Sequence, residues 1–254
     1  MEQELFDQSF CDHCACGAGL DFDFSFAFQP VVDAEDATVL AYEALVRGLN
    51  GEGAGEVLAR VTRKNMYRFD QACRVKAVKL ASELGMTSNL CINFMPNAVY
   101  RAETCIQTTL AAANRYEFDT NRLVFEFTEV EDLANTDHLI SIIDAYAEMG
   151  FAIALDDYGA GYSRMNLLTD TTPQYVKLDM SLIRNVHEHP RKQAVIEGVL
   201  LTNYRLGIAT IAEGVETEAE YQLCRQMGIR YFQGFLLARP GFETLPDPYI
   251  PSDH

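Results

Sequence analysis

The chain has 254 residues, of which 48% are hydrophobic and 22% charged, and its formal net charge is −17. This is the composition of a globular protein with a buried core, and the excess of acids argues against binding to DNA or RNA polymers, whose phosphates are held largely by Lys and Arg. No apolar run approaches the roughly 18 residues of a membrane span. The first twenty residues are acidic and polar, so we expect no secretory signal. An odd number of cysteines, seven, favours reduced thiols and a cytoplasmic location.

The first 22 residues contain the segment "CDHCACG", with Cys11, His13, Cys14 and Cys16 close together. A Cys-x2-Cys pair supplies half of a tetrahedral zinc site. No second pair follows at the spacing of a zinc finger, so whether these residues bind a metal stays open. We expect residues 1–22 to form a cysteine-containing, loosely ordered tail and residues 23–250 to form one folded domain.

Strand-like and helix-like segments alternate through that domain. Strands are expected at 24–32, 38–46, 90–95, 122–128, 151–156, 174–179, 208–213 and 230–234. Helical spacing occurs at 56–84, 102–114, 137–149, 190–206 and 217–227. Eight strands that alternate with helices predict an α/β fold, a TIM-like (β/α)8 barrel, over the alternative of an open doubly wound sheet.

The connection between the first two strands departs from this pattern. Only "DAEDA" separates them, whereas a parallel crossover needs a dozen or more residues. These strands must form an antiparallel hairpin. The barrel is therefore expected to have its first strand reversed.

Polar side chains recur near the carboxyl ends of the other strands. In a barrel these ends meet at one mouth, where barrel enzymes place their chemistry. Two glycines follow the adjacent acids Asp156 and Asp157 at the end of the fifth strand. The side chains expected at the mouth are Glu43, Asn93, Glu126, Asp156, Asp157, Lys177, Glu213 and Gln233.

Five carboxylates with one lysine would repel one another without added positive charge. Carboxylate and amide oxygens suit hard cations such as Mg²⁺ or Mn²⁺, and the lack of histidine argues against zinc. This many carboxylates favours two ions, the arrangement that cleaves phosphodiesters. In that arrangement Asp156 bridges the ions and Asp157 completes the second. Ca²⁺, which prefers longer bonds and more ligands, is expected to occupy the site and to inhibit.

Seven motifs in this order resemble the EAL-domain cyclic di-GMP phosphodiesterases. The triplet that gives the family its name is Glu43-Ala44-Leu45 in "YEALVRG". It lies between "FAFQP" and the later motifs "INFMPN", "FEFTE", "LDDYGAGYS", "VKLD", "AEGVET" and "FQGFLLARP". The resemblance covers nearly the whole chain beyond the tail. It implies hydrolysis of cyclic di-GMP to linear 5′-pGpG on a barrel with one antiparallel strand.

The resemblance also implies roles for individual residues. Glu43, Asn93, Glu126 and Asp156 match ligands of the first metal, Asp157 matches a ligand of the second, and Gln233 lies in the metal and water shell. Glu213 matches the favoured general base, with Lys177 beside the attacking water. Arg47 matches a phosphate contact, and Gln29, Leu45 and Pro240 match the substrate groove. Glu129 and Glu216 match acids that support loops.

Four departures from the family pattern affect no implied ligand. They are Gly48, Met95, Ala160 and Arg164, the last two in the loop that couples the metal site to the dimer contact in this family. The resemblance therefore implies a catalytically active bacterial protein, with a homodimer and a regulatory protein partner as expected assemblies. The alternatives are a silent cyclic di-GMP receptor and an anti-repressor-like interaction module.

Overall fold

The computed structural model describes residues 20–99, 101–128, 136–160 and 167–251. Eight strands form the barrel: β1 (Ser25–Asp33), β2 (Thr38–Arg47), β3 (Asn89–Phe94), β4 (Leu123–Thr128), β5 (Ala152–Tyr158), β6 (Tyr175–Leu178), β7 (Ala209–Ala212) and β8 (Tyr231–Phe232). A short β9 (Gly241–Phe242) pairs with β1. The Cys11 to Cys16 cluster lies outside the described residues.

The sheet closes through its reversed first strand. Strands β2 to β8 are parallel to their neighbours in chain order, and β1 pairs antiparallel with both β2 and β8. The turn Asp33 to Ala37 makes the tight hairpin possible because the Asp33 carboxylate accepts from the amides of Glu35 and Asp36. The predicted barrel with one antiparallel strand is confirmed, and the open-sheet alternative is wrong.

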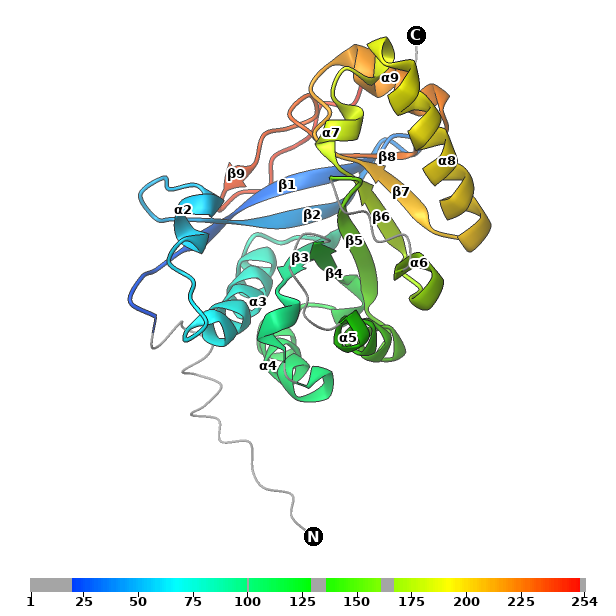
Figure 1. Cartoon of the computed structure of the whole chain (residues 1–254). Helices are drawn as coiled ribbons and strands as arrows, with labels where there is room; N and C mark the ends of the chain where they lie inside the picture. Colours follow the sequence, from blue (N-terminus) through cyan, green and yellow to red (C-terminus); the bar gives the residue numbers. More distant parts are fainter. Residues whose placement is uncertain (1–19, 100, 129–135, 161–166, 252–254) are drawn as a thin grey trace.

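Helices surround the strands in Figure 1. They are α2 (Ala54–Leu58), α3 (Met66–Glu83), α4 (Ala102–Arg115), α5 (Thr136–Glu148), α6 (Leu167–Asp170), α7 (Met180–Ile183), α8 (Pro190–Leu206) and α9 (Glu218–Gln226). The described residues also form three 3₁₀ turns, η1 (Pro96–Ala98), η2 (Thr120–Arg122) and η3 (Val186–Glu188). Among the described residues, no helix is both long enough and apolar enough to cross a membrane.

The single helix expected at 56–84 is wrong, because the structure has two helices, α2 and α3. Asn65 precedes α3, and its side-chain oxygen accepts from the Thr62 amide at 2.6 Å. This local hydrogen bond competes with continued helix geometry. The interruption contains no glycine or proline, so the helical spacing gives no sign of it.

A layer of small apolar side chains supports the barrel mouth from inside. Its members are Val31, Ala41, Cys91, Val124, Ala154 and Ile211. Because strand side chains alternate with a period of two, the residues two positions further along five of these strands face the same interior. Those residues are Glu43, Asn93, Glu126, Asp156 and Glu213. The fold therefore sets a polar layer directly on an apolar one.

Candidate metal centre

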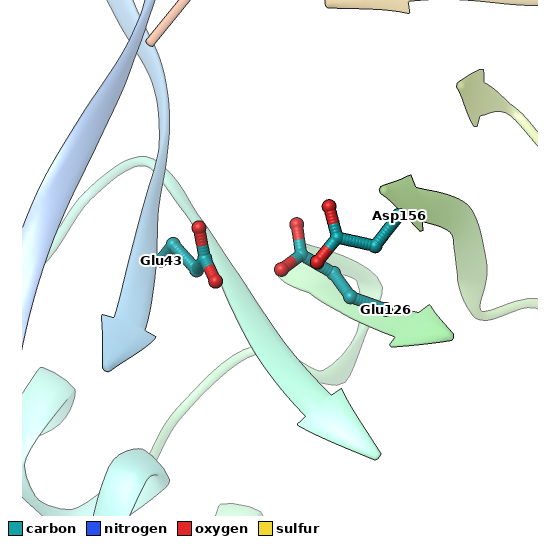
Figure 2. Close-up of side chains that lie close together, drawn as sticks. All are labelled: Glu43, Glu126 and Asp156. Carbon is teal, nitrogen blue, oxygen red and sulfur yellow. The ribbon is translucent and has the colours of Figure 1, made fainter. Parts of the chain in front are cut away.

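Glu43, Glu126 and Asp156 point toward one another from β2, β4 and β5, as Figure 2 shows. One oxygen of each carboxylate lies within 4.8 Å of the others, and all three residues are buried. Asp156, Asp157 and Glu213 form a second such group. Asp156 is the residue that the two groups share.

Lys177 supplies the positive charge at the centre of these acids. Its Nζ lies 2.7 Å from Glu213 Oε1, 3.1 Å from both Glu126 Oε1 and Asp156 Oδ1, and 3.2 Å from Glu43 Oε2. The side chain is fully buried. Burial alone would lower the pKa of Lys177, but the surrounding carboxylates raise it well above its ordinary value. Lys177 is therefore a fixed cation, and it leaves most of the acidic charge uncompensated.

Amide side chains hold the Glu43 carboxylate. Asn93 Nδ2 donates to Glu43 Oε1 at 2.7 Å, and Gln233 Nε2 donates to Oε2 at 2.7 Å. Burial favours the neutral acid, but Lys177 and these hydrogen bonds outweigh it and lower the pKa of Glu43. Glu43 therefore stays ionised in a position fixed from three sides.

Glu126 and Glu213 have raised pKa values because they are buried beside other negative charges. Burial raises the pKa of Glu126 well above its usual range, and the charge of Glu43 adds to the effect. Burial and the charge of Asp156 do the same to the pKa of Glu213. A bound cation would reverse this shift by stabilising the charged forms.

Asp157 occupies an unusual backbone position at the end of β5. Its φ is 55°, in the left-handed region that a non-glycine residue seldom adopts, and the pairing of β5 with β6 is irregular between Leu155 and Tyr158. Burial, followed by the charge of Asp156, raises the pKa of Asp157 to about 6. The irregularity lets two consecutive side chains, Asp156 and Asp157, line the same cavity despite strand alternation.

The donor set fits divalent cations. Both carboxylate oxygens of Glu126, Asp156 Oδ1 and Gln233 Oε1 are buried without a hydrogen-bond partner among the described residues, although Lys177 lies near the first two side chains. Buried acceptors left unpaired cost free energy. Oxygen atoms of this kind are the ligands that hard cations prefer. Two overlapping carboxylate groups around Asp156 match a two-cation arrangement.

Two cavities meet at these acids. One, of about 300 Å³, is lined by Gln29, Glu213 and Gln233 among others, and the second, of about 360 Å³, extends toward α2 and α3. Leu45 lines both. Gln29 also donates to the Ala238 carbonyl at 3.0 Å.

Two of the expected groove residues lie differently. Arg47 lines neither cavity; its guanidinium donates to the Val46 carbonyl at 2.7 Å. Pro240 also lies outside both linings, two residues beyond Ala238. The structure therefore brings Gln29 and Leu45, but not Arg47 or Pro240, to the walls of these cavities.

Of the two acids expected to support loops, Glu216 lies within the described residues and Glu129 does not. Glu216 lines the smaller cavity and forms an ion pair with Arg184 at 2.6 Å. Glu129 and Arg164 lie outside the described residues.

Sequence reasoning missed Asp179, which lines the same cavity as Asp157. Its carboxylate accepts from the Ser181 amide at 2.9 Å and caps α7. Asp179 stands two residues beyond Lys177 in "VKLD". The alternation of strand side chains was the signal that could have found it.

The chain is similar to several solved structures and curated proteins. Among solved structures, a standalone versatile EAL protein from Vibrio cholerae O395 in its c-di-GMP-bound form is 48% identical, with a TM-score of 0.88, covering 91% of this chain and 98% of that one. BlrP1 of Klebsiella pneumoniae, in a manganese/cy-diGMP complex, is 33% identical with a TM-score of 0.81, covering 87% of this chain and 56% of that one.

Among curated proteins, the antirepressor BluF of Escherichia coli (strain K12) is 27% identical over 235 residues, 91% of this chain and 58% of BluF. The probable cyclic di-GMP phosphodiesterase PdeG of the same strain is 28% identical over 84% of this chain and 44% of PdeG. The chain thus spans roughly half of these relatives. The family model described as EAL domain matches residues 20–240. The chain belongs to the EAL domain family.

Proposed function

We propose that this protein is a cyclic di-GMP phosphodiesterase that uses Mg²⁺ or Mn²⁺ and releases linear 5′-pGpG. The observation that carries the proposal is Asp156, which belongs to both carboxylate groups at the barrel mouth. A two-cation site with a shared carboxylate suits in-line cleavage of a phosphodiester.

The residues at the barrel mouth are assigned separate roles in cation binding, water binding and proton transfer. Glu43, Asn93, Glu126 and Asp156 would hold the first cation, and Asp156 and Asp157 would hold the second. Gln233 would stand in the water shell, with Asp179 lining the same cavity. When bound, the cations supply a nucleophilic water and stabilise charge on the phosphoryl oxygens. Glu213 takes the proton of the attacking water at Oε2, while Lys177 holds its Oε1 at 2.7 Å. The buried cluster keeps these groups in place before substrate arrives.

Substrate contacts complete the proposal. Gln29 and Leu45 line the cavity above the acids, and we assign Arg47 and Pro240 to the outer groove on the family resemblance. Glu129 and Glu216 are assigned loop support on the same basis. The homodimer and the regulatory protein partner are proposed on that basis too. The cytoplasmic location, Ca²⁺ inhibition and the division into tail (1–22) and barrel (23–250) are proposed from the cysteine content, the ligand preference of Ca²⁺ and the sequence pattern.

Relatives support both the proposal and its alternative. PdeG is named a probable cyclic di-GMP phosphodiesterase. BlrP1 has been solved in two separate cyclic di-GMP complexes, one with manganese and one with calcium. BluF, however, is named an antirepressor. A silent receptor or interaction module is therefore the second candidate, and the retention of the acids, Asn93 and Lys177 favours the enzyme.

One assay separates these candidates. The protein is incubated with cyclic di-GMP and Mg²⁺, Mn²⁺, Ca²⁺ or EDTA, and products are resolved by chromatography. We expect 5′-pGpG with Mg²⁺ or Mn²⁺, little with Ca²⁺ and none with EDTA. Nucleotide binding without product would indicate a receptor, and absence of both would indicate an interaction module. Full activity in EDTA would refute the metal mechanism.

A further inference from the structure

A separate hollow of about 410 Å³ lies where the amino-terminal ends of α3 and α4 meet η1. Figure 1 shows α3 and α4 side by side on the outside of the barrel. None of the residues that line this hollow lines the cavities of the metal centre. It is therefore a distinct concave surface.

Two arginines give the hollow its charge. Arg63 precedes α3 and Arg101 precedes α4, and both are exposed. Within the described part of the chain, neither guanidinium has a hydrogen bond or ion pair, whereas Arg184 and Arg230 both pair with acids. No Asp or Glu is among the described residues lining the hollow. In a chain of net charge −17, this is a local concentration of uncompensated positive charge.

The other walls suit a ligand with an aromatic part. Tyr67, 38% exposed, provides an aromatic ring, and the buried Ala98 and Cys105 add apolar surface to the lining. Thr104, whose amide donates to the Arg101 carbonyl at 3.2 Å, adds a hydroxyl to the lining. Guanidinium groups bind phosphate oxygens in paired hydrogen bonds, and aromatic side chains stack on bases.

We propose that this hollow binds a nucleoside monophosphate, with the phosphate between Arg63 and Arg101 and the base against Tyr67. Its volume fits a ligand of this size within the 300–1,000 Å³ typical of small-molecule pockets. A nucleic-acid polymer is a poor fit because the chain as a whole carries a net charge of −17, which repels a long run of phosphates. The site is independent of the phosphodiesterase proposed above.

The test is titration of GMP into the full chain in EDTA, followed by calorimetry. We expect one saturable site per chain. The double variant Arg63→Ala/Arg101→Ala should bind about tenfold or more weakly, since it removes both guanidinium groups that would hold the phosphate. The double variant Arg68→Ala/Arg191→Ala removes the same charge from exposed sites outside the hollow and should bind like the parent. Thermal unfolding of each variant verifies the fold.

Further arms identify the ligand and the location. Inorganic phosphate and guanosine should each bind more weakly than GMP. Equal affinity for phosphate would overturn the role of the base, and equal affinity for guanosine would overturn the role of the arginines. The site itself is refuted by absence of saturation at millimolar GMP, by equal weakening in both double variants, or by loss of GMP binding in Glu43→Ala. Cyclic di-GMP hydrolysis in Arg63→Ala/Arg101→Ala is expected to be unchanged, so either proposal can fail alone.

Discussion

Asp157 combines three costs in one residue: a left-handed backbone, partial burial and the adjacent charge of Asp156. Strain of this kind persists where the surroundings require it, and it concentrates at functional sites. Here the cost places a second carboxylate beside Asp156 in the cavity. A bound cation would offset the like charge of the two carboxylates. The strained backbone is therefore consistent with a cation site.

The pKa of Asp157 predicts a pH-dependent stability. It rises from 3.8 to about 6 on folding, so the folded chain binds this proton more tightly than the unfolded chain. Ionised Asp157 therefore costs stability, and the cost grows as pH rises from about 4 to 6. In EDTA, Asp157→Asn should match the parent near pH 4 and exceed it near pH 7.5 by about 1–2 kcal/mol, after discounting for partial exposure. Urea unfolding at both pH values measures this difference; a gap that is constant with pH contradicts it.

Glu213 offers a separation of binding from chemistry. Glu213→Gln keeps the size of the side chain but cannot act as a base, so turnover should fall about 10²–10⁴-fold. Affinity for cyclic di-GMP, measured by calorimetry with Ca²⁺, should change far less, because other residues line the groove. Glu218→Gln, an exposed acid in the first turn of α9 that lines neither cavity, is the matched control and should retain most activity. A parallel fall of rate and affinity would make Glu213 a ligand or structural acid.

At the level of elements, the order and alternation of the strands were enough to predict the barrel and most residues at its mouth. The hairpin followed from a five-residue connection, and the strand ends placed Glu43, Asn93 and Glu126 at one mouth. Two features escaped. The break between α2 and α3 depends on a side-chain hydrogen bond of Asn65, which helical periodicity does not reveal. The contacts of Lys177 with four acids depend on barrel closure, so spacing along the chain could not give them.

A buried ion pair links α3 to the loop after β3. Arg74 Nη2 lies 2.7 Å from Asp70 Oδ2, and Nη1 donates to the Tyr146 hydroxyl at 2.8 Å. The arginine also stacks 4.4 Å from the centre of the Phe94 ring. Asp70 Oδ1 accepts from the Met95 amide at 3.1 Å. The pair thus supports the segment that carries Asn93.

Removal of one partner should be costly. Arg74→Ala leaves Asp70 buried without its cation and should lower the free energy of unfolding by about 3–5 kcal/mol. Replacing both, as Asp70→Asn/Arg74→Met, should recover part of the loss because no lone charge remains buried. Arg68→Ala, on the exposed side of α3, is the control. Urea unfolding decides: a loss below about 1 kcal/mol for Arg74→Ala would show that the pair contributes little.

Across the whole molecule, barrel closure gathers acids that are more than a hundred residues apart in the chain, from Glu43 to Glu213. A layer of small apolar residues holds them from below, and Lys177 compensates only part of their charge. Bound divalent cations would compensate the remaining charge, which links the fold to the proposed chemistry.

The most direct test of that claim is a Mn²⁺ titration with turnover of cyclic di-GMP measured on the same samples. We predict two Mn²⁺ per chain and activity that rises as the second site fills. Asp157→Asn should lose the second site, and Asp156→Asn should impair both, each with loss of nearly all turnover. Binding of fewer than one Mn²⁺ per parent chain, or turnover that does not depend on Mn²⁺ or Mg²⁺, would contradict the account.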